Sequence, residues 1–271
     1  MASPPPYPFQ LCQPDGAKSC GACCGLYNWH DHSRKTLNSL LQRKTSSFFS
    51  LGKEIDFHHC RQWTEVPASN AKLLEAIYNC EFLGFIDRGQ KRVGCLLHPS
   101  IHQRVDLRWN SFYGVELCAG HFCPSYTHLT KVEQSAVFMA LDDWYLYGLV
   151  ITDIDLVKEF FKHVQNRLGE SIRVECLENI KVRTALRDFF RFKEFWKFSS
   201  AKNRLGKYYF SYSEYQIARI EYEKRWQIKP SHFDKILVSL SSEFTTQADV
   251  GEAESLIEEA IERFVEAYFS S

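Results

Sequence analysis

The sequence lacks the long apolar runs and the charge excess that mark several classes of protein. No stretch of 18 or more residues is apolar throughout, so we expect no transmembrane helix. The opening residues, MASPPPYPFQ, contain neither a basic nor an apolar region, so they do not resemble a secretory signal. Lys plus Arg and Asp plus Glu number 33 each, which gives no overall attraction to nucleic acid or to anionic membranes. These absences predict a cytoplasmic protein without a membrane span.

The sequence also lacks the motifs of the common enzyme sites. It contains no G-x-G-x-x-G, no Walker A loop, no G-x-S-x-G and no H-E-x-x-H. No glycine-rich strand-to-helix turn marks a Rossmann site for S-adenosylmethionine. The residues alone therefore support no particular reaction, and whether the protein is an enzyme stays open.

Cysteine, in contrast, is abundant and unevenly placed. Residues 12–24 read CQPDGAKSCGACC, with the spacing C-x7-C-x2-C-C, and only Cys176 of the ten cysteines lies after residue 124. A disulfide framework is one reading, but adjacent cysteines bridge poorly and a cytosolic protein keeps its thiols reduced. The glycines at 16, 21 and 25 can let this loop curl, so that its sulfurs converge. The pattern favours a metal centre.

Eight thiols are candidate metal ligands. A C-x2-C step is the spacing that places two sulfurs on one metal or cluster. The set is Cys12, Cys20, Cys23, Cys24, Cys80, Cys95, Cys118 and Cys123. All-thiolate ligation suits both zinc and iron–sulfur clusters. Structural zinc sites usually use two separated knuckles, whereas here one knuckle has dispersed partners, so we favour a 4Fe–4S cluster over zinc. The number of centres stays open.

The order of these cysteines resembles a family. The stretch C…CxxCC, then CEFL, then a basic turn followed by GC and two apolar residues, then a further Cys, is similar to CxxCxxCC-type zinc- or iron-chelating proteins, a group that includes flagellin lysine-N-methylase. The matching residues are Cys12, Cys20, Cys23, Cys24, Cys80, Cys95 and Cys118, within residues 12–124. The resemblance implies metal chelation and leaves the reaction open. The longer first gap, the Arg108–Trp109 pair in place of Arg-Pro, and the extra Cys123 depart from the family pattern.

Other polar residues have weaker claims. His98 and His121 each lie three residues from a candidate Cys ligand and could bind metal, although a core or supporting role is the simpler reading. His30 and His32 resemble a metal site, but we expect them to lie on a surface loop. Lys18, Arg88, Lys91 and Arg92 are close in sequence to the thiols and could offset their charge. The stretch 187–210 interleaves basic and aromatic residues as nucleic-acid-binding segments do. However, its aromatics recur at helical spacing, which favours a core-facing stripe.

The remaining chain predicts a mostly α protein that divides near Pro124. Residues 1–124 form an irregular Cys-rich metal-binding region, and 125–271 an α-helical region that shares its core. Caps and apolar spacing predict helices over 33–49, 69–80, 130–148, 152–169, 182–198, 213–226, 231–244 and 253–269. The expected start signals include a cap at Ser33, a capping box of Thr130 and Glu133, and the stretch TDID at Thr152–Asp155. Gly148 and Gly169 are the expected stops. One hairpin is expected within 82–98, with its turn at Asp87–Gly89.

The leading function hypothesis is a cytoplasmic metal-binding protein with a cysteine-ligated centre in a redox or structural role. Its partner would be another protein or a redox partner of unknown identity, and nucleic acid is not expected. The alternatives are a protein-modifying enzyme such as a lysine N-methylase, on the resemblance alone, and a zinc-stabilised interaction module that uses residues 187–210.

Overall fold

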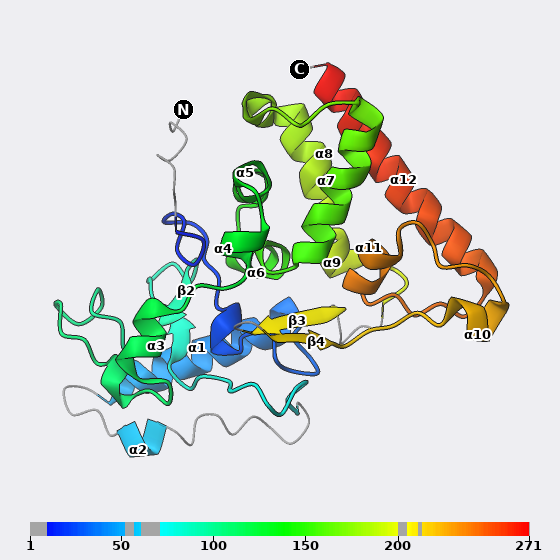
Figure 1. The fold of residues 1–271 in the computed structure, drawn as a ribbon. Helices are drawn as coiled ribbons and strands as arrows, with labels where there is room; N and C mark the ends of the chain where they lie inside the picture. Colours follow the sequence, from blue (N-terminus) through cyan, green and yellow to red (C-terminus); the bar gives the residue numbers. More distant parts are fainter. Residues whose placement is uncertain (1–9, 52–56, 61–70, 200–204, 211–212, 271) are drawn as a thin grey trace. The chain divides into compact units, whose positions relative to one another are not determined.

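The chain forms a mostly helical protein with two small antiparallel sheets (Figure 1). The structure is a computed structural model and describes residues 10–51, 57–60, 71–199, 205–210 and 213–270. Two compact units divide the chain. The first comprises Met1–Phe122 and Asp143–Gly148, and the second comprises Cys123–Asp142 and Leu149–Ser271. Among the described helices, none combines the length and the apolar character that crossing a bilayer requires.

The first unit is built around a helix and a hairpin. Its elements are η1 (Ala22–Cys24), α1 (Arg34–Ser50), α2 (Phe57–Cys60), β1 (Leu83–Phe85), β2 (Val93–Cys95), η3 (Arg108–Asn110) and α3 (Gly114–Gly120). Ser33 caps α1, as its position predicts. The hairpin is also confirmed: β1 pairs with β2, and Asp87 accepts hydrogen bonds from the backbone N–H groups of Lys91 and Arg92 in its turn. Thr45 of α1 accepts a hydrogen bond from Phe85 N at 2.7 Å, which fixes helix to hairpin.

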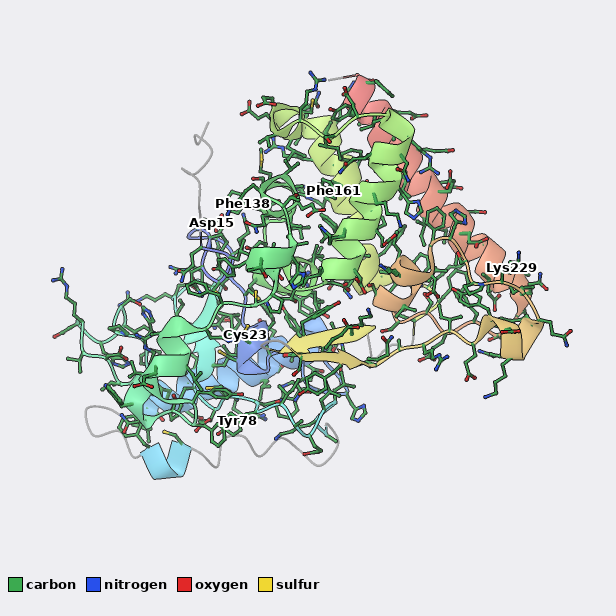
Figure 2. The ribbon with its side chains drawn as sticks, viewed as in Figure 1. Asp15, Cys23, Tyr78, Phe138, Phe161 and Lys229 are labelled. Carbon is green, nitrogen blue, oxygen red and sulfur yellow. The ribbon has the colours of Figure 1, made fainter. Side chains whose placement is uncertain are left out.

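The second unit is a helical layer. Its elements are α4 (Ser125–His128), α5 (Lys131–Ala140), α7 (Ile154–Leu168), η4 (Val174–Glu178), α8 (Ile180–Phe190), α9 (Phe192–Phe195), β3 (Lys207–Phe210), β4 (Ser213–Gln216), α10 (Tyr222–Trp226), α11 (Asp234–Ser239) and α12 (Gln247–Phe269). The helices α7, α8 and α12 pack side by side (Figure 1). Phe160 stacks on Phe189 with ring centroids 4.2 Å apart and meets Phe264 edge-on. Phe161, labelled in Figure 2, is 1% exposed.

Several helix predictions are confirmed by their caps. Thr130 and Glu133 form the predicted capping box of α5. Asp153 caps α7, and Gly169 ends it at φ 71°. The long C-terminal helix exists and starts earlier than predicted, at a second capping box made by Thr246 and Asp249. The expected helix over 182–198 is divided into α8 and α9.

The helix predicted over 130–148 is wrong in its second half. Helix α5 ends at Ala140, and Asp143 begins a separate helix, α6 (Trp144–Ile151), by accepting from the N–H groups of Tyr145 and Leu146. Gly148 lies inside α6 and does not stop it. A side chain at Gly148 would meet the hydroxyl of Tyr27, so the glycine permits close packing.

Two other helix predictions are wrong because tertiary contacts override the local pattern. Of the predicted helix 69–80, the described residues 71–80 are irregular, since the Asn28 amide donates to the carbonyls of Leu74 and Ile77. Residues 213–216 form strand β4 and not a helix, and they pair with β3 across Tyr208 and Tyr215. Aromatic cross-strand pairs of this kind stabilise a hairpin. Only α10 remains of the predicted helix 213–226.

Candidate metal centre

The first cysteine loop is fixed by backbone turns and by β2. Cys20 N donates to Cys12 O at 2.9 Å, which places these two residues side by side. Asp15 (labelled in Figure 2) accepts from the N–H groups of Ala17 and Lys18 and shapes the turn between them. Val93 N donates to Ser19 Oγ at 2.6 Å, and Gln13 Nε2 donates to Val93 O at 2.7 Å. The loop therefore lies against the strand that carries Cys95.

The CGACC segment forms the one-turn helix η1 and is closed by Gly25. Gly25 adopts φ 77°, in the left-handed region that favours glycine. A Cβ atom at Gly25 would lie 2.6 Å from Tyr78 O and 2.7 Å from Asn79 Cα, so only glycine permits this approach. Cys80 N then donates to Cys24 O at 2.9 Å. Cys24 and Cys80, far apart in the chain, are neighbours for this reason.

A buried asparagine pair supports the segment before Cys80. The Asn28 amide also donates to Asn79 Oδ1 at 2.7 Å, and the Asn79 amide donates to Asn28 O at 3.0 Å. Both side chains are almost fully buried. Polar groups that satisfy each other in this way hold a unique backbone path.

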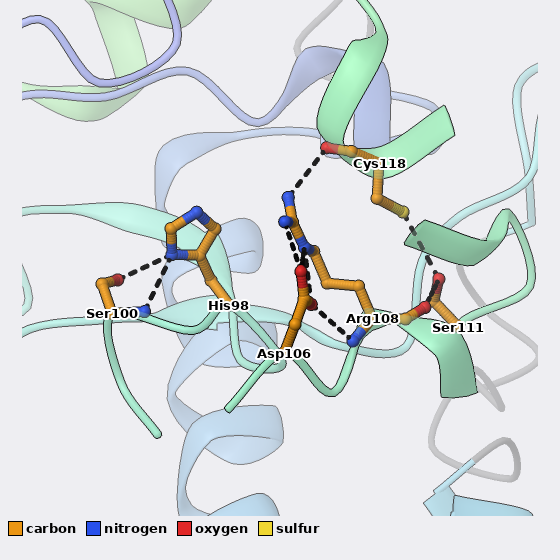
Figure 3. A network of polar contacts seen from close by, with 6 residues as sticks. All are labelled: His98, Ser100, Asp106, Arg108, Ser111 and Cys118. Carbon is orange, nitrogen blue, oxygen red and sulfur yellow. Dashed lines mark hydrogen bonds and ion pairs between the residues drawn. The ribbon is translucent and has the colours of Figure 1, made fainter. Parts of the chain in front are cut away.

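The third and fourth thiols come from the hairpin and from α3. Cys95 ends β2 and pairs with Leu83 of β1 in the strand register. Leu83 follows Cys80 by three residues, so the hairpin relates Cys95 to Cys80. Cys118 lies on α3, which packs on η3. Ser111 Oγ and Cys118 Sγ are 3.3 Å apart, and Figure 3 shows this contact. The two thiols differ in exposure, since Cys95 is half-buried and Cys118 is exposed.

Electrostatics relates the thiols of Cys12, Cys24, Cys80, Cys95 and Cys118, which we call the thiol cluster. Burial raises the pKa of Cys24 well above its ordinary value, and the charges of Cys80, Cys95, Cys118 and Cys12 raise it further. Burial likewise raises the pKa of Cys95 to about 11, with a contribution from Cys118. These influences act between segments that the backbone contacts of Cys12, Cys24 and Cys80 and the register of Cys95 bring together. The neighbouring phenol of Tyr113 has its pKa raised to about 12 by burial and by Cys24, Cys80 and Cys118.

The other predicted ligands are Cys20 and Cys23 on the first loop and Cys123 after α3. Cys20 and Cys23 are half-buried on the first loop, and Cys23 is labelled in Figure 2. Cys123 is buried and belongs to the second unit, as does Cys176. Within the described ranges, no group of three or more His, Cys, Asp or Glu side chains has the spacing of a metal site. The cluster is thus a gathering of thiols rather than a closed coordination sphere.

The three candidate histidines of this unit lie in different environments. His98 Nδ1 lies 2.7 Å from Ser100 Oγ, in an exposed position (Figure 3). His121 is half-buried, and burial lowers its pKa. His32 was predicted on a surface loop, but it is fully buried, with Nδ1 2.7 Å from Trp29 O.

The four cations nearest to the thiols in sequence have other contacts as well. Lys18 pairs with Asp15 at 2.8 Å, Arg92 donates to Gln13, and Arg88 and Lys91 are exposed. Two cations that the sequence did not suggest, Lys44 and Arg108, also act on the thiols. Burial lowers the pKa of Lys44 to about 8, while Cys80, Glu81 and Cys24 act in the opposite direction.

Arg108 is held by a carboxylate and turned toward α3. Its guanidinium pairs with Asp106 at 2.6 Å, and Nη1 donates to Cys118 O at 3.4 Å (Figure 3). The hydrogen bonds from Arg108 lower the pKa of Asp106 to about 2. Arg108 lowers the pKa of Cys95, which favours the thiolate there.

Sequence reasoning missed Lys44, although the sequence contained a signal. Leu37, Leu41, Lys44 and Phe48 recur at the spacing of one helix face, and all four are buried. A lysine in the core stripe of an amphipathic helix is unusual and needs a partner.

The 187–210 segment is mainly structural where it is described. Phe189 and Trp196 are buried, which agrees with a core-facing stripe, and Trp196 Nε1 donates to Ser242 Oγ. Phe195, in contrast, is 62% exposed.

Comparison of this chain with family models, with curated proteins and with solved structures found no match. The thiol cluster itself is therefore the evidence for function.

Proposed function

We propose that the protein binds a metal centre through Cys24, Cys80, Cys95 and Cys118. The observation that carries the proposal is that tertiary contacts bring these segments together: Cys80 N donates to Cys24 O, and Leu83, three residues after Cys80, pairs with Cys95. The electrostatic influence of these thiols on one another supports it. Burial raises the pKa values of Cys24, Cys80 and Cys95, and a bound metal ion would replace their protons. The resemblance to CxxCxxCC-type chelating proteins points in the same direction. Cys12 is the fifth thiol of the cluster and could join or exchange with the four.

The donor set fits a thiophilic metal. Four thiolates are the usual shell of structural zinc and of iron–sulfur clusters. The dispersed origin of the ligands favours the iron–sulfur cluster of the 4Fe–4S type, in a redox or structural role, with zinc as the alternative. Cytoplasmic conditions would keep these thiols reduced.

The first test is metal and acid-labile sulfide analysis of protein purified without oxygen, together with a visible spectrum. Iron with matching sulfide and a colour that bleaches with dithionite would support a redox cluster. Colourless protein with stoichiometric zinc would support a structural centre. A chain that carries neither metal, even after anaerobic reconstitution, would refute the proposal.

A matched pair of variants tests the ligand set. Cys24→Ala should release most of the metal and lower the melting temperature, because ligands also organise the fold. Cys176→Ala, in the second unit, should retain full metal content. Equal metal loss from the two variants would contradict the assignment.

A further inference from the structure

Lys44 occupies a place that an apolar residue would ordinarily fill. It lies on the buried face of α1 between Leu41 and Phe48, and its side chain is 3% exposed. Removing an ammonium group from water is unfavourable unless other groups compensate for its hydration. The surroundings of Lys44 should therefore contain groups that require its charge.

The hydrogen bonds of Lys44 are incomplete. Its ammonium group has three donors, and one of them binds Cys80 O at 2.8 Å. Within the part of the chain that the structure describes, no ion pair within 4.0 Å involves this group. Glu81, the residue after Cys80, is fully buried. One of its carboxylate oxygens accepts from the Tyr78 hydroxyl at 2.7 Å, and the other, Oε1, has no hydrogen-bond partner.

Two contacts place the segments of Cys80 and Cys24 beside Lys44: its ammonium group donates to Cys80 O, and Cys80 N donates to Cys24 O. Cys80, Glu81 and Cys24 are the residues whose negative charge favours its protonated form. Thiolate sulfur bound to a metal is a hydrogen-bond acceptor, and N–H···S bonds tune both zinc and iron–sulfur centres. Neutral thiols make much weaker acceptors, which explains why the ammonium group is only partly satisfied beside them.

We propose that Lys44 is a positioning residue of the metal centre, whose ammonium group donates hydrogen bonds to the thiolates of Cys80 and Cys24 when metal is bound. This inference rests on the proposed function and deepens it. The charge of Glu81, the residue after Cys80, also favours the charged form of Lys44. The hydrogen bond from Lys44 to Cys80 O also holds α1 against the segment that carries Cys80. The charge of Lys44 and this hydrogen bond therefore act on the same cysteine.

The experiment separates the effect of the Lys44 charge from that of its hydrogen bond to Cys80 O. Lys44→Gln keeps an N–H donor for Cys80 O and removes the charge, whereas Lys44→Met removes both. Lys35→Met, an exposed position on the same helix, is the matched control. The readouts are metal content after purification, competition for that metal against a chelator, and the thermal stability of metal-free protein.

We expect both Lys44 variants to bind the metal at least tenfold more weakly, with Lys35→Met within twofold of the wild type. The metal-free Lys44→Met protein should be as stable as the wild type or more so, because an apolar side chain replaces a buried charge. If Lys44→Met fails to fold, Lys44→Gln alone decides the matter. Wild-type affinity in Lys44→Gln would overturn the inference and leave the metal centre standing. Wild-type protein without any metal would overturn both.

Discussion

Replacement of Gly25 by alanine tests the close backbone contact that brings Cys24 and Cys80 together. Gly25 has φ 77°, and a Cβ atom there would lie 2.6 Å from Tyr78 O and 2.7 Å from Asn79 Cα. The left-handed conformation costs an L-residue about 1–2 kcal/mol. Both obstructing atoms are backbone, so the segments must separate. The bond from Cys80 N to Cys24 O would then be lost, at about 1–3 kcal/mol.

Together these effects predict that Gly25→Ala lowers the free energy of unfolding of the first unit by about 2–5 kcal/mol. Two other glycines of this unit calibrate the result. Gly114 has φ 69° and open space around it, so Gly114→Ala should cost about 1–2 kcal/mol from strain alone. Gly16 has neither constraint, so Gly16→Ala should stay within about 0.5 kcal/mol of the wild type.

Urea unfolding followed by circular dichroism gives the stability of each variant. Native-state hydrogen exchange at the Cys80 amide measures the hydrogen bond from Cys80 N to Cys24 O directly. This amide should lose its protection in Gly25→Ala and keep it in the other two variants. A loss in Gly25→Ala no larger than in Gly114→Ala would refute the reasoning, since the steric contact would then carry no free energy.

Three further predictions concern the second unit. Lys193 is fully buried and donates to Asp153 Oδ2 at 2.7 Å. Lys193→Met leaves that carboxylate buried without its ion-pair partner, so it should lower the free energy of unfolding in urea by about 3–5 kcal/mol. The added change Asp153→Asn should recover part of the loss, because it removes the unpaired charge. Burial, with His232, lowers the pKa of His163 below its ordinary 6.5, so its neutral form favours folding. Stability is then fully present above pH 6.5 and falls as the pH drops through the lowered pKa; a melting-temperature series in which His163→Gln keeps the same slope as the wild type would contradict this. Thr246→Ala removes the capping box of α12 and should cost about 1 kcal/mol in thermal unfolding, whereas Ser255→Ala on the same helix serves as the control.

Local signals in the sequence were sufficient for much of the helical structure. The caps at Ser33, Thr130 and Asp153 and the stop at Gly169 predicted helix ends correctly, because a cap acts on backbone groups within one turn. The same reasoning failed where distant groups compete for the backbone. The Asn28 amide binds the carbonyls of Leu74 and Ile77, which prevents a helix there, and residues 213–216 pair with β3 as a strand.

The candidate site shows the same division. The spacing C-x2-C-C identified a loop rich in thiols, and the sequence alone named the eight candidate ligands. Their spatial order depends on contacts between distant segments: the bond from Cys80 to Cys24, the register of Cys95 in the hairpin, and the packing of α3 on η3.

The sequence by itself determined the supply of thiols, the lack of net charge and several helix ends, since these depend on composition and on neighbours within a few residues. Only the tertiary structure decided that Cys24 and Cys80 are neighbours, that Cys123 belongs to the other unit, and that Lys44 donates to Cys80 O. The physical reason is range. A thiol cluster and its buried cation are defined by desolvation and electrostatics, which depend on distance in space and not on distance along the chain.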